Sequence, residues 1–338
     1  MAKNKSGQSL KDALSSVFAV SALLIALAVA IVVFIFVMGN PANFEGNNPA
    51  GQPLPGNFLG IIYKGGFIVP LLITAILVLL TFTFERMISI EIARGGPIKY
   101  AMTKFSLRII SFILTLFGFF ELLFGGIFGR LEHFSYGQYV WGGIIIVLAG
   151  VVFAIASLVL NKYNAGAFLK KLQSLLSADR IEDAIAECDK QKGSIANVAR
   201  AALSKYRELQ NDTKLVKEQK VLALQKEFDE AATLEAPMLS KNLVFLSTIA
   251  SLAVLIGLLG TVFGMIRAFA ALAQAGAPDA LALATGISEA LINTAFGIGG
   301  SAGAIILYNY FSSVIDGMTF KIDEAGFSIV ETFKANTK

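Results

Sequence analysis

The sequence predicts an all-α integral membrane protein with about six transmembrane helices and a cytoplasmic helical bundle. Hydrophobic residues make up 55% of the 338 residues, charged residues only 15%, and the mean hydropathy is +0.68. Soluble globular chains carry about 25% charged residues, so this composition favours a membrane protein. Residues 161–241 hold 14 of the 28 basic and 12 of the 24 acidic side chains, which predicts that the main soluble part lies there.

Two apolar runs come first along the chain. The earlier one is too long for the apolar core of a signal peptide, so we expect a membrane helix over about Val17–Met38. Half of the eight prolines fall in Asn40–Lys64, which is predicted to be an irregular aqueous loop. Gly65–Phe84 is long enough to cross a bilayer. The charged residues after it, with a turn at 93–97, are expected to end that helix.

The remaining elements follow from the same patterns. Ile109–Gly129 and Tyr139–Leu160 are apolar runs with a short link, which predicts an antiparallel membrane hairpin. Residues 161–241 have apolar residues at helical spacing and predict several soluble helices, whose start forms a short hairpin. Asn242–Ile266 and Ala290–Ile315 are uncharged and give the fifth and sixth membrane helices.

Basic residues are distributed unevenly between the two sides of this arrangement. Six spans place both termini on one side, which then holds 25 of the 28 Lys and Arg residues. The positive-inside rule therefore makes the termini and the soluble helices cytoplasmic. Of the few basic residues left on the other side, Arg267 is expected to snorkel at the outer interface.

The sequence gives no support for an enzyme, a cofactor or a metal site. One histidine, His133, is too few for a His-based metal site or catalytic triad and is expected to be solvated. The single cysteine, Cys188, excludes an internal disulfide and is expected to pack rather than react. GIGGSA (297–302) matches a dinucleotide pattern but lies in a membrane helix. The net charge of +4 is too small to favour nucleic acid, and Glu121 is expected to be a neutral, hydrogen-bonded glutamate.

A narrow polar stripe runs along the sixth helix. Thr285, Glu289 and Asn293 are four residues apart and share one face, which Gly297 and Ser301 continue. A carboxylate in a membrane helix costs roughly 3 kcal/mol on insertion scales. Because Glu289 lies among small and polar residues, we predict that it lines a water-accessible path and exchanges protons, rather than being merely satisfied by hydrogen bonds.

The fifth helix carries a matching set of small residues, namely Gly257, Gly260, Thr261 and Gly264. With the turn between the helices centred near Ala275, Thr261 stands level with Glu289 and Gly257 with Thr294, to within about one turn. Glycines at such spacing more often pack helices closely than line a pore, so packing around the pore is their predicted role.

Three stretches carry a family resemblance. IGLLGTVFGMIRAF (256–269), LATGISEALINTAFGI (283–298) and LYNYF (307–311) look like the glycine-rich helix, the glutamate helix and the terminal Tyr-Asn-x-Phe of the ExbB/TolQ/MotA family of bacterial proton-channel subunits, and of ExbB most closely. Residues 65–86 are a weaker match to the first helix of the family. The chain departs from the family in having six predicted membrane helices rather than three, and Val254 where the family has proline.

The resemblance implies a homo-oligomeric ring, described for the family as a pentamer, around an ExbD-like single-span protein with an intramembrane aspartate. Glu289 would correspond to the family glutamate. Thr261 and Thr294 would correspond to the threonines that line the proton route. The chain offers no obvious relay partner for Glu289, and that aspartate would fill the gap. The ring would sit in the bacterial inner membrane and convert proton motive force into mechanical work on its partner and a TonB-like protein.

The alternatives are a TolQ-like or MotA-like stator subunit, a proton-coupled solute transporter, and a structural scaffold. The lipid bilayer is the other expected partner. These inferences divide the chain into an N-terminal membrane helix with a periplasmic loop (1–64), an ExbB-like first helix with a cytoplasmic turn (65–104), an inserted membrane hairpin (105–160), a cytoplasmic helical domain (161–241), a pore-lining helix pair (242–316) and a cytoplasmic tail (317–338).

Overall fold

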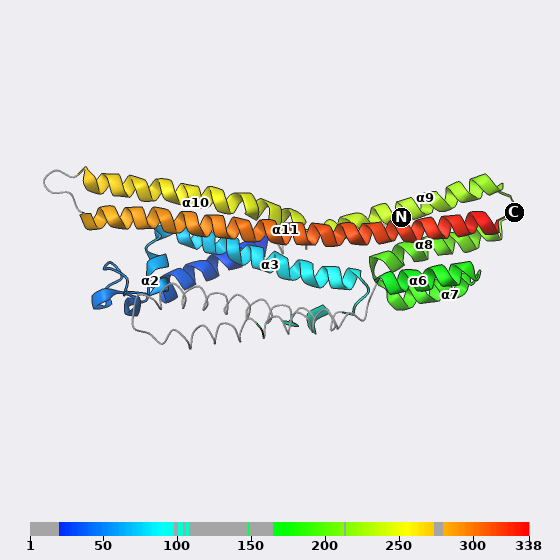
Figure 1. Ribbon diagram of the computed structural model, residues 1–338, viewed down its shortest axis with the longest axis horizontal. Helices are drawn as coiled ribbons and strands as arrows, with labels where there is room; N and C mark the ends of the chain where they lie inside the picture. The colour runs from blue at the N-terminus through cyan, green and yellow to red at the C-terminus, as the bar shows by residue number, and fades with distance from the viewer. Residues whose placement is uncertain are drawn as a thin grey trace. The chain divides into compact units, whose positions relative to one another are not determined.

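The computed structural model describes residues 20–97, 101–103, 106–107, 148, 165–212, 214–273 and 280–337 (Figure 1). The chain forms two compact units, one from Met1–Thr83 and Asn242–Ser312 and the other from Phe84–Lys241 and Ser313–Lys338. The secondary structure of the described residues is helical, and the only strand-like feature among them is an isolated bridge between Phe44 and Pro53. The predicted all-α class is confirmed.

Four helical stretches in the described part are long and apolar enough to cross a membrane, namely Val20–Met38, Gly66–Ala93, Lys217–Leu272 and Ala280–Asn336. They correspond to four of the six predicted membrane helices, and the chain is a multi-pass membrane protein. The other two, Ile109–Gly129 and Tyr139–Leu160, lie outside the described residues except for Leu148, as do Glu121 and His133.

The loop after the first helix is more regular than predicted. The stretch Val20–Met38 ends in a π-helix, η1 (Val33–Met38). Two 3₁₀ turns, η2 (Pro41–Asn43) and η3 (Glu45–Asn47), and the short helix α2 (Phe58–Tyr63) then follow. Met38, Ile62 and Val69 form a small buried cluster, which Tyr63 and Phe296 contact. This apolar contact is one reason why the segment is not irregular.

Asparagine side chains supply the hydrogen bonds that this loop needs. Asn43 is buried, and its Nδ2 donates to the carbonyl oxygens of Val37 at 2.8 Å and Met38 at 2.9 Å. Asn57 Nδ2 donates to Asn43 Oδ1 at 3.0 Å, while Asn57 Oδ1 accepts from the backbone N–H of Gly60 in α2. The side chains therefore satisfy backbone groups that a regular helix would otherwise pair internally.

The next helix continues past its predicted end. A 3₁₀ turn, η4 (Gly66–Ile68), leads into α3 (Val69–Ala93), which includes Glu85 and Arg86 rather than stopping before them. Charged residues do not end this helix because they are paired: Arg86 bonds Glu85 within α3. The predicted turn at 93–97 is present, with Gly95 at a φ of +97°. Glycine adopts this left-handed backbone conformation without steric cost.

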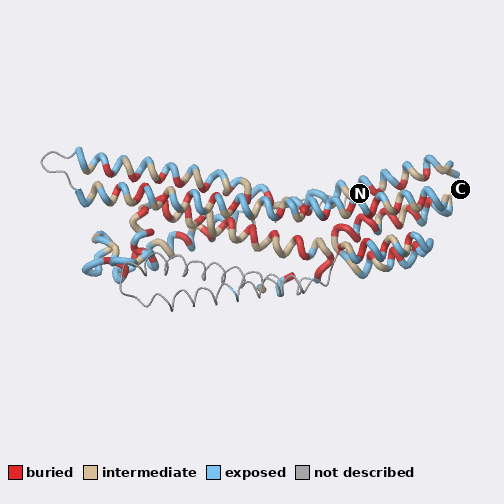
Figure 2. The backbone as a smooth tube through the Cα atoms, viewed as in Figure 1, coloured by how far each residue is buried: buried red, intermediate tan, exposed pale blue. Residues whose placement is uncertain are grey.

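The two glycine-bearing helices are also longer than predicted. They are α10 (Leu243–Leu272) and α11 (Ala280–Asn336), which run side by side in the unit that contains residues 242–312 (Figure 1). Along both helices, buried positions alternate with exposed ones (Figure 2). The segment predicted as a tail is helical as well, since its buried residues recur at helical spacing, namely Met318, Ile322, Ala325, Ile329 and Phe333.

The other unit contains the predicted soluble helices, namely α6 (Ala165–Ser177), α7 (Ile181–Gln191), α8 (Gly193–Gln210) and α9 (Lys217–Ser240). Helices α6 and α7 form the expected short hairpin. In the core, the rings of Tyr206 and Phe333 meet edge-on with centroids 4.7 Å apart. Cys188 is buried, and burial raises the pKa of its thiol to about 12, which agrees with a packing role.

Candidate functional site

Helices α10 and α11 approach each other through glycines. A Cβ built on Gly257 would lie 2.9 Å from the Cα of Gly297, and one built on Gly264 would lie 2.7 Å from the carbonyl oxygen of Gly286. Real Cβ atoms do not make contacts this short, so larger residues would force the backbones apart. The packing role predicted for Gly257, Gly264 and Gly297 is consistent with this geometry.

An ion pair crosses between the two helices. Nη1 of Arg267 on α10 donates to Oε1 of Glu289 on α11 at 3.0 Å and to Oε2 at 2.8 Å. The Glu289 side chain is 3% exposed and that of Arg267 55%. The structure thus gives Glu289 an ion-pair partner in its own chain that the sequence did not predict, although an arginine keeps its proton and cannot itself relay one.

A glycine turn covers the carboxylate of Glu289. Gly66, at the start of η4, has a φ of +73°, and a Cβ built there would overlap Oε1 of Glu289. The guanidinium of Arg267 lies 5.6 Å from the ring centroid of Phe67, a cation–π contact that holds the arginine on the same side. The glutamate is thus enclosed by α10, α11 and the η4 turn.

Asn293 lies one turn further along the stripe. It is fully buried, and its Nδ2 donates to the carbonyl oxygen of Gly65 at 2.9 Å. Its Oδ1 is buried without a hydrogen-bond partner in the described part of the chain. A Cβ on Gly260 would meet the Asn293 side chain at 2.5 Å, so Gly260 makes the space that Asn293 fills. A buried acceptor of this kind costs free energy unless a donor such as water reaches it.

Thr261 and Thr294 are directly joined. Their Oγ1 atoms are 2.6 Å apart, and each also lies within hydrogen-bond distance of a carbonyl oxygen of its own helix, Gly257 at 3.1 Å and Ala290 at 3.0 Å. Because the two hydroxyls have one proton each, one of them donates to the other threonine while the other donates to its carbonyl oxygen. The partner expected level with Thr261 was Glu289, so the helices pair about one turn further along than predicted. This shift is what brings Arg267 level with Glu289.

The outer members of the stripe differ from one another. Ser301 is buried, and its Oγ donates across the helix pair to the carbonyl oxygen of Ala250 at 2.6 Å. Thr285 bonds the carbonyl oxygen of Leu281 in its own helix at 2.8 Å, and no hydrogen bond among the described residues joins it to Glu289. The site therefore extends from Glu289 through Asn293 and Thr294 toward Ser301.

Two parts of this site were not found from the sequence. Arg267 was missed because the register of the helix pair was set one turn away. The Gly65–Gly66 pair was missed because it lies at the end of a long apolar run. The sequence does contain a signal for the arginine, namely its opposite charge. Arg267 is the charged residue of the fifth helix closest to the turn, and Glu289 is the charged residue of the sixth helix closest to it.

The chemistry that the side chains of this site offer is proton exchange. No group of three or more His, Cys, Asp or Glu side chains that could hold a metal ion occurs among residues that the structure describes. A carboxylate can take up and release a proton, and each threonine hydroxyl is both a donor and an acceptor. Such a row of groups can relay a proton where water has access.

The family comparison is consistent with this chemistry. Residues 190–324, which include the ion pair, the two threonines and the glycines, match the MotA/TolQ/ExbB proton channel family. Among relatives, the chain is 34% identical over 85 residues to the biopolymer transport protein ExbB of Pseudomonas putida and 40% identical over 83 residues to the Tol-Pal system protein TolQ of Pseudomonas aeruginosa. It is 30% identical over 109 residues to the biopolymer transport protein ExbB of Xanthomonas campestris.

These similarities are local. They cover 25%, 25% and 32% of this chain and 26%, 36% and 43% of the three relatives, so the chain matches less than half of each relative's length. The relatives nevertheless bear the names ExbB and TolQ, which the family match also carries. Residues 190–324 of this chain thus match the MotA/TolQ/ExbB proton channel family, and the named relatives are consistent with that match.

Proposed function

We propose that this chain is the proton-conducting subunit of an energy-transducing complex in the bacterial inner membrane. Proton flow along α10 and α11 would drive mechanical work on an ExbD-like single-span partner with an intramembrane aspartate, and through it on a TonB-like protein that energises outer-membrane transport. The observation that carries the proposal is the ion pair between the buried Glu289 and Arg267, beside the Thr261–Thr294 contact and within the segment that matches the proton channel family.

In the proposed route, Glu289 is the site that accepts and releases the proton. Arg267 pairs with its carboxylate, so a proton that reaches Glu289 must displace the arginine from that ion pair. The free Oδ1 of Asn293 would hold a water between Glu289 and the threonines, and the Thr261 and Thr294 hydroxyls would pass the proton on. Thr285 would lie at the entrance. The glycines and Ser301 would keep the two helices close enough for this short relay.

We propose a homo-oligomeric ring, with five copies as in the family, in which residues 242–316 surround the partner helix. Apolar side chains on the outside of the helix pair support contacts with lipid or with other copies, since several are at least half exposed, namely Leu258, Val262, Ile266, Leu291 and Ile306. Both termini and residues 161–241 would be cytoplasmic. The partner proposal rests on the family alone, because Glu289 is already paired within this chain.

Proton uptake into vesicles tests this function. The chain would be reconstituted with its ExbD-like partner, and uptake measured with a pH-sensitive dye under an applied membrane potential. We expect Glu289→Gln to reduce uptake to the level of empty vesicles while co-purification with the partner is retained. Glu331→Gln is the matched control, because this exposed carboxylate pairs only with Lys334 on the surface. Full uptake by Glu289→Gln would contradict the proposal, and uptake lost equally in both variants would not support it.

A TolQ-like function is the second candidate. The observation in its favour is that two TolQ relatives are 40% and 42% identical to the chain over about 80 residues. Both tasks would use the same proton route, so uptake does not separate them. Deletion of the gene in its host would: loss of energised nutrient uptake favours the ExbB-like task, and envelope leakage with normal uptake favours the TolQ-like one.

A further inference from the structure

A cavity of about 760 Å³ lies within the unit formed by Phe84–Lys241 and Ser313–Lys338. Its walls come from the last turns of α3 and the glycine turn that follows, from the turn between α7 and α8, and from the end of α9. It is separate from the proton site, and none of the roles proposed above uses it.

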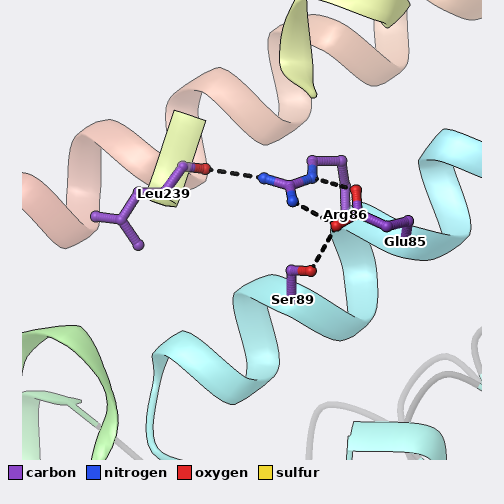
Figure 3. A network of polar contacts seen from close by, with 4 residues as sticks. All are labelled: Glu85, Arg86, Ser89 and Leu239. Carbon is purple, nitrogen blue, oxygen red and sulfur yellow. Dashed lines mark hydrogen bonds and ion pairs between the residues drawn. The ribbon is translucent and has the colours of Figure 1, made fainter. Parts of the chain in front are cut away.

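The polar side chains on one wall of this cavity already have hydrogen-bond partners within the chain (Figure 3). Arg86 is 2% exposed; its guanidinium bonds Glu85 at 2.5 and 2.7 Å and donates to the carbonyl oxygen of Leu239 at 3.1 Å. Ser89 donates to the same carboxylate at 2.8 Å. The arginine thereby caps one of the last carbonyl groups of α9, which has no partner within its own helix. Because its charges cancel, this wall holds α3 and α9 together without requiring a ligand.

The other walls carry positive charge that is not cancelled. Lys190, Lys192 and Lys241 line the cavity, and Lys190 reaches a carboxylate only at 3.8 Å, that of Glu187 outside the lining. Lys192 and Lys241 have no carboxylate within 4 Å in the part of the chain that the structure describes. The remaining acid of the lining, Glu235, accepts a hydrogen bond from Asn197 and keeps its charge, so it offsets one of the three lysines and leaves these walls with a positive excess. The cavity is therefore suited to an anion.

The start of α8 adds hydrogen-bond donors to the same cavity. The helix begins at Gly193, and the residue before it, Lys192, gives no side-chain cap to the first-turn N–H groups. Ser194 lines the cavity and is 5% exposed, yet its hydroxyl has no hydrogen-bond partner among the described residues. Uncapped N–H groups at a helix start favour anions, and a hydroxyl that faces the cavity without a protein partner can donate to one.

The backbone at this point is held in place. Gly193 has a φ of +83°, and a Cβ there would overlap the carbonyl oxygen of Ala93. A Cβ on Gly95 would overlap the carbonyl oxygen of Gln191, and Gln191 Nε2 donates to the carbonyl oxygen of Arg94 at 3.0 Å. The turn after α3 and the start of α8 are thus one rigid element, so the donors are in position before a ligand arrives.

We propose that this cavity binds a phosphate group, through Lys192, Lys241 and the start of α8 with Ser194. The position in the chain favours the headgroup of an anionic phospholipid as its source. The cavity is at the end of the membrane-capable stretch Gly66–Ala93, and Lys241 lies two residues before the apolar helix α10. Ile92 and Met238, which are 39% and 66% exposed, line the same cavity and offer contact to the lipid glycerol and upper chain.

Binding to the full-length chain in a neutral detergent tests this inference. The probes are dihexanoyl phosphatidylglycerol below its micelle concentration, inorganic phosphate, and a glutamate-rich peptide, each titrated by calorimetry. The test variants are Lys192→Gln/Lys241→Gln and, separately, Ser194→Ala. The matched control is Lys170→Gln/Lys334→Gln, which removes the same charge from exposed sites outside the cavity. Circular dichroism at rising temperature checks that each variant is folded.

We expect saturable binding of the lipid that weakens at least tenfold in the double lysine variant, weakens less in Ser194→Ala and stays within twofold in the control. Saturation by the lipid alone identifies a headgroup site, and competition by inorganic phosphate identifies a site for free phosphate as well. The proposal is overturned if neither phosphate probe saturates, if the control variant loses as much affinity as the test variant, or if the peptide binds more tightly than both.

Discussion

Arg267 on α10 donates from one guanidinium nitrogen, Nη1, to both carboxylate oxygens of Glu289 on α11, at 3.0 and 2.8 Å. The acid is nearly inaccessible and the base is about half exposed. Loss of the arginine should therefore cost more stability than loss of the glutamate, because it would leave a buried carboxylate without a partner.

Removal of the arginine should therefore destabilise the chain more than removal of both partners. Arg267→Gln leaves an unpaired buried carboxylate, for which we expect a loss of about 1–3 kcal/mol in the free energy of unfolding. Arg267→Gln/Glu289→Gln should recover part of that loss. Thermal unfolding of the full chain in one detergent measures both, with Arg207→Gln as the control for an exposed pair. Simple additivity of the two single changes would contradict the coupling.

The close approach of the two helices predicts a sharp contrast between glycines. Gly264→Ala places a methyl group 2.7 Å from the backbone of α11 and should cost about 1–3 kcal/mol. Gly317→Ala is the control, because nothing in the described structure lies within 4 Å of the added Cβ, and alanine favours a helix by up to about 1 kcal/mol. Thermal unfolding midpoints that move equally in the two variants would argue against tight packing at Gly264.

The joined threonines predict an effect on proton transfer without an effect on folding. Thr261→Val and Thr294→Val keep the shape of the side chain and remove one hydroxyl of the 2.6 Å pair. We expect each to reduce proton uptake roughly tenfold, which is milder than the effect of Glu289→Gln. Thr319→Val, whose hydroxyl bonds only its own helix, should leave uptake unchanged. Normal uptake in both test variants would remove the threonines from the route.

Cys188 provides a pH-dependent prediction. Burial raises the pKa of its thiol to about 12, above the value of about 8.5 for an exposed thiol. Between these values the unfolded chain ionises at this group and the folded chain does not, so the contribution to stability is full below about pH 8.5 and is lost as the pH rises toward 12. At pH 8.5, alkylation by iodoacetamide should be about a hundredfold slower or more in the folded chain than in urea.

Because Cys188 is the only cysteine, mass spectrometry of the intact chain follows its alkylation directly. Equal rates in buffer and in urea would show that the thiol is accessible in the folded chain.

The end of α11 predicts a difference between two phenylalanines. Phe333 is fully buried against Tyr206, and Phe333→Ala should cost about 3–5 kcal/mol. Phe327 is 71% exposed, and Phe327→Ala should change stability by less than about 0.5 kcal/mol. Limited proteolysis reports the difference, since only the first variant should be cleaved rapidly near its C-terminus. Equal protection in the two variants would mean that this segment does not pack as described.

The sequence predicted the helical class and the residues of the stripe, because membrane helices must pair every backbone group internally and leave few alternatives. It could not set the register of the helix pair. If the centre of the turn shifts by one residue, the residue that faces a given position on the other helix changes by two. A shift of a few residues therefore decides whether Thr261 or Arg267 lies nearest to Glu289. Apolar pattern alone carries no information on that shift.

Helix ends are also hard to predict where charged residues follow an apolar run. The charges of Glu85 and Arg86 predict a helix end, yet their pairing allows α3 to continue to Ala93. Asn43 shows the reverse problem, since a polar, proline-rich loop was expected to be irregular and its asparagines instead order it. In each case tertiary hydrogen bonds decide the outcome, and a single sequence does not show them.

Gly66 packs against Glu289, which is far from it in the sequence, so substitutions at the two positions should be correlated among homologues. Its left-handed backbone excludes other side chains on one ground, and the carboxylate of Glu289 excludes them on another. A homologue that has the acid should therefore also have a glycine at this position. In a homologue without the acid, only the left-handed backbone would still favour glycine there. Paired substitution at these two positions, read across many genomes, would reveal this dependence without a single purified sample.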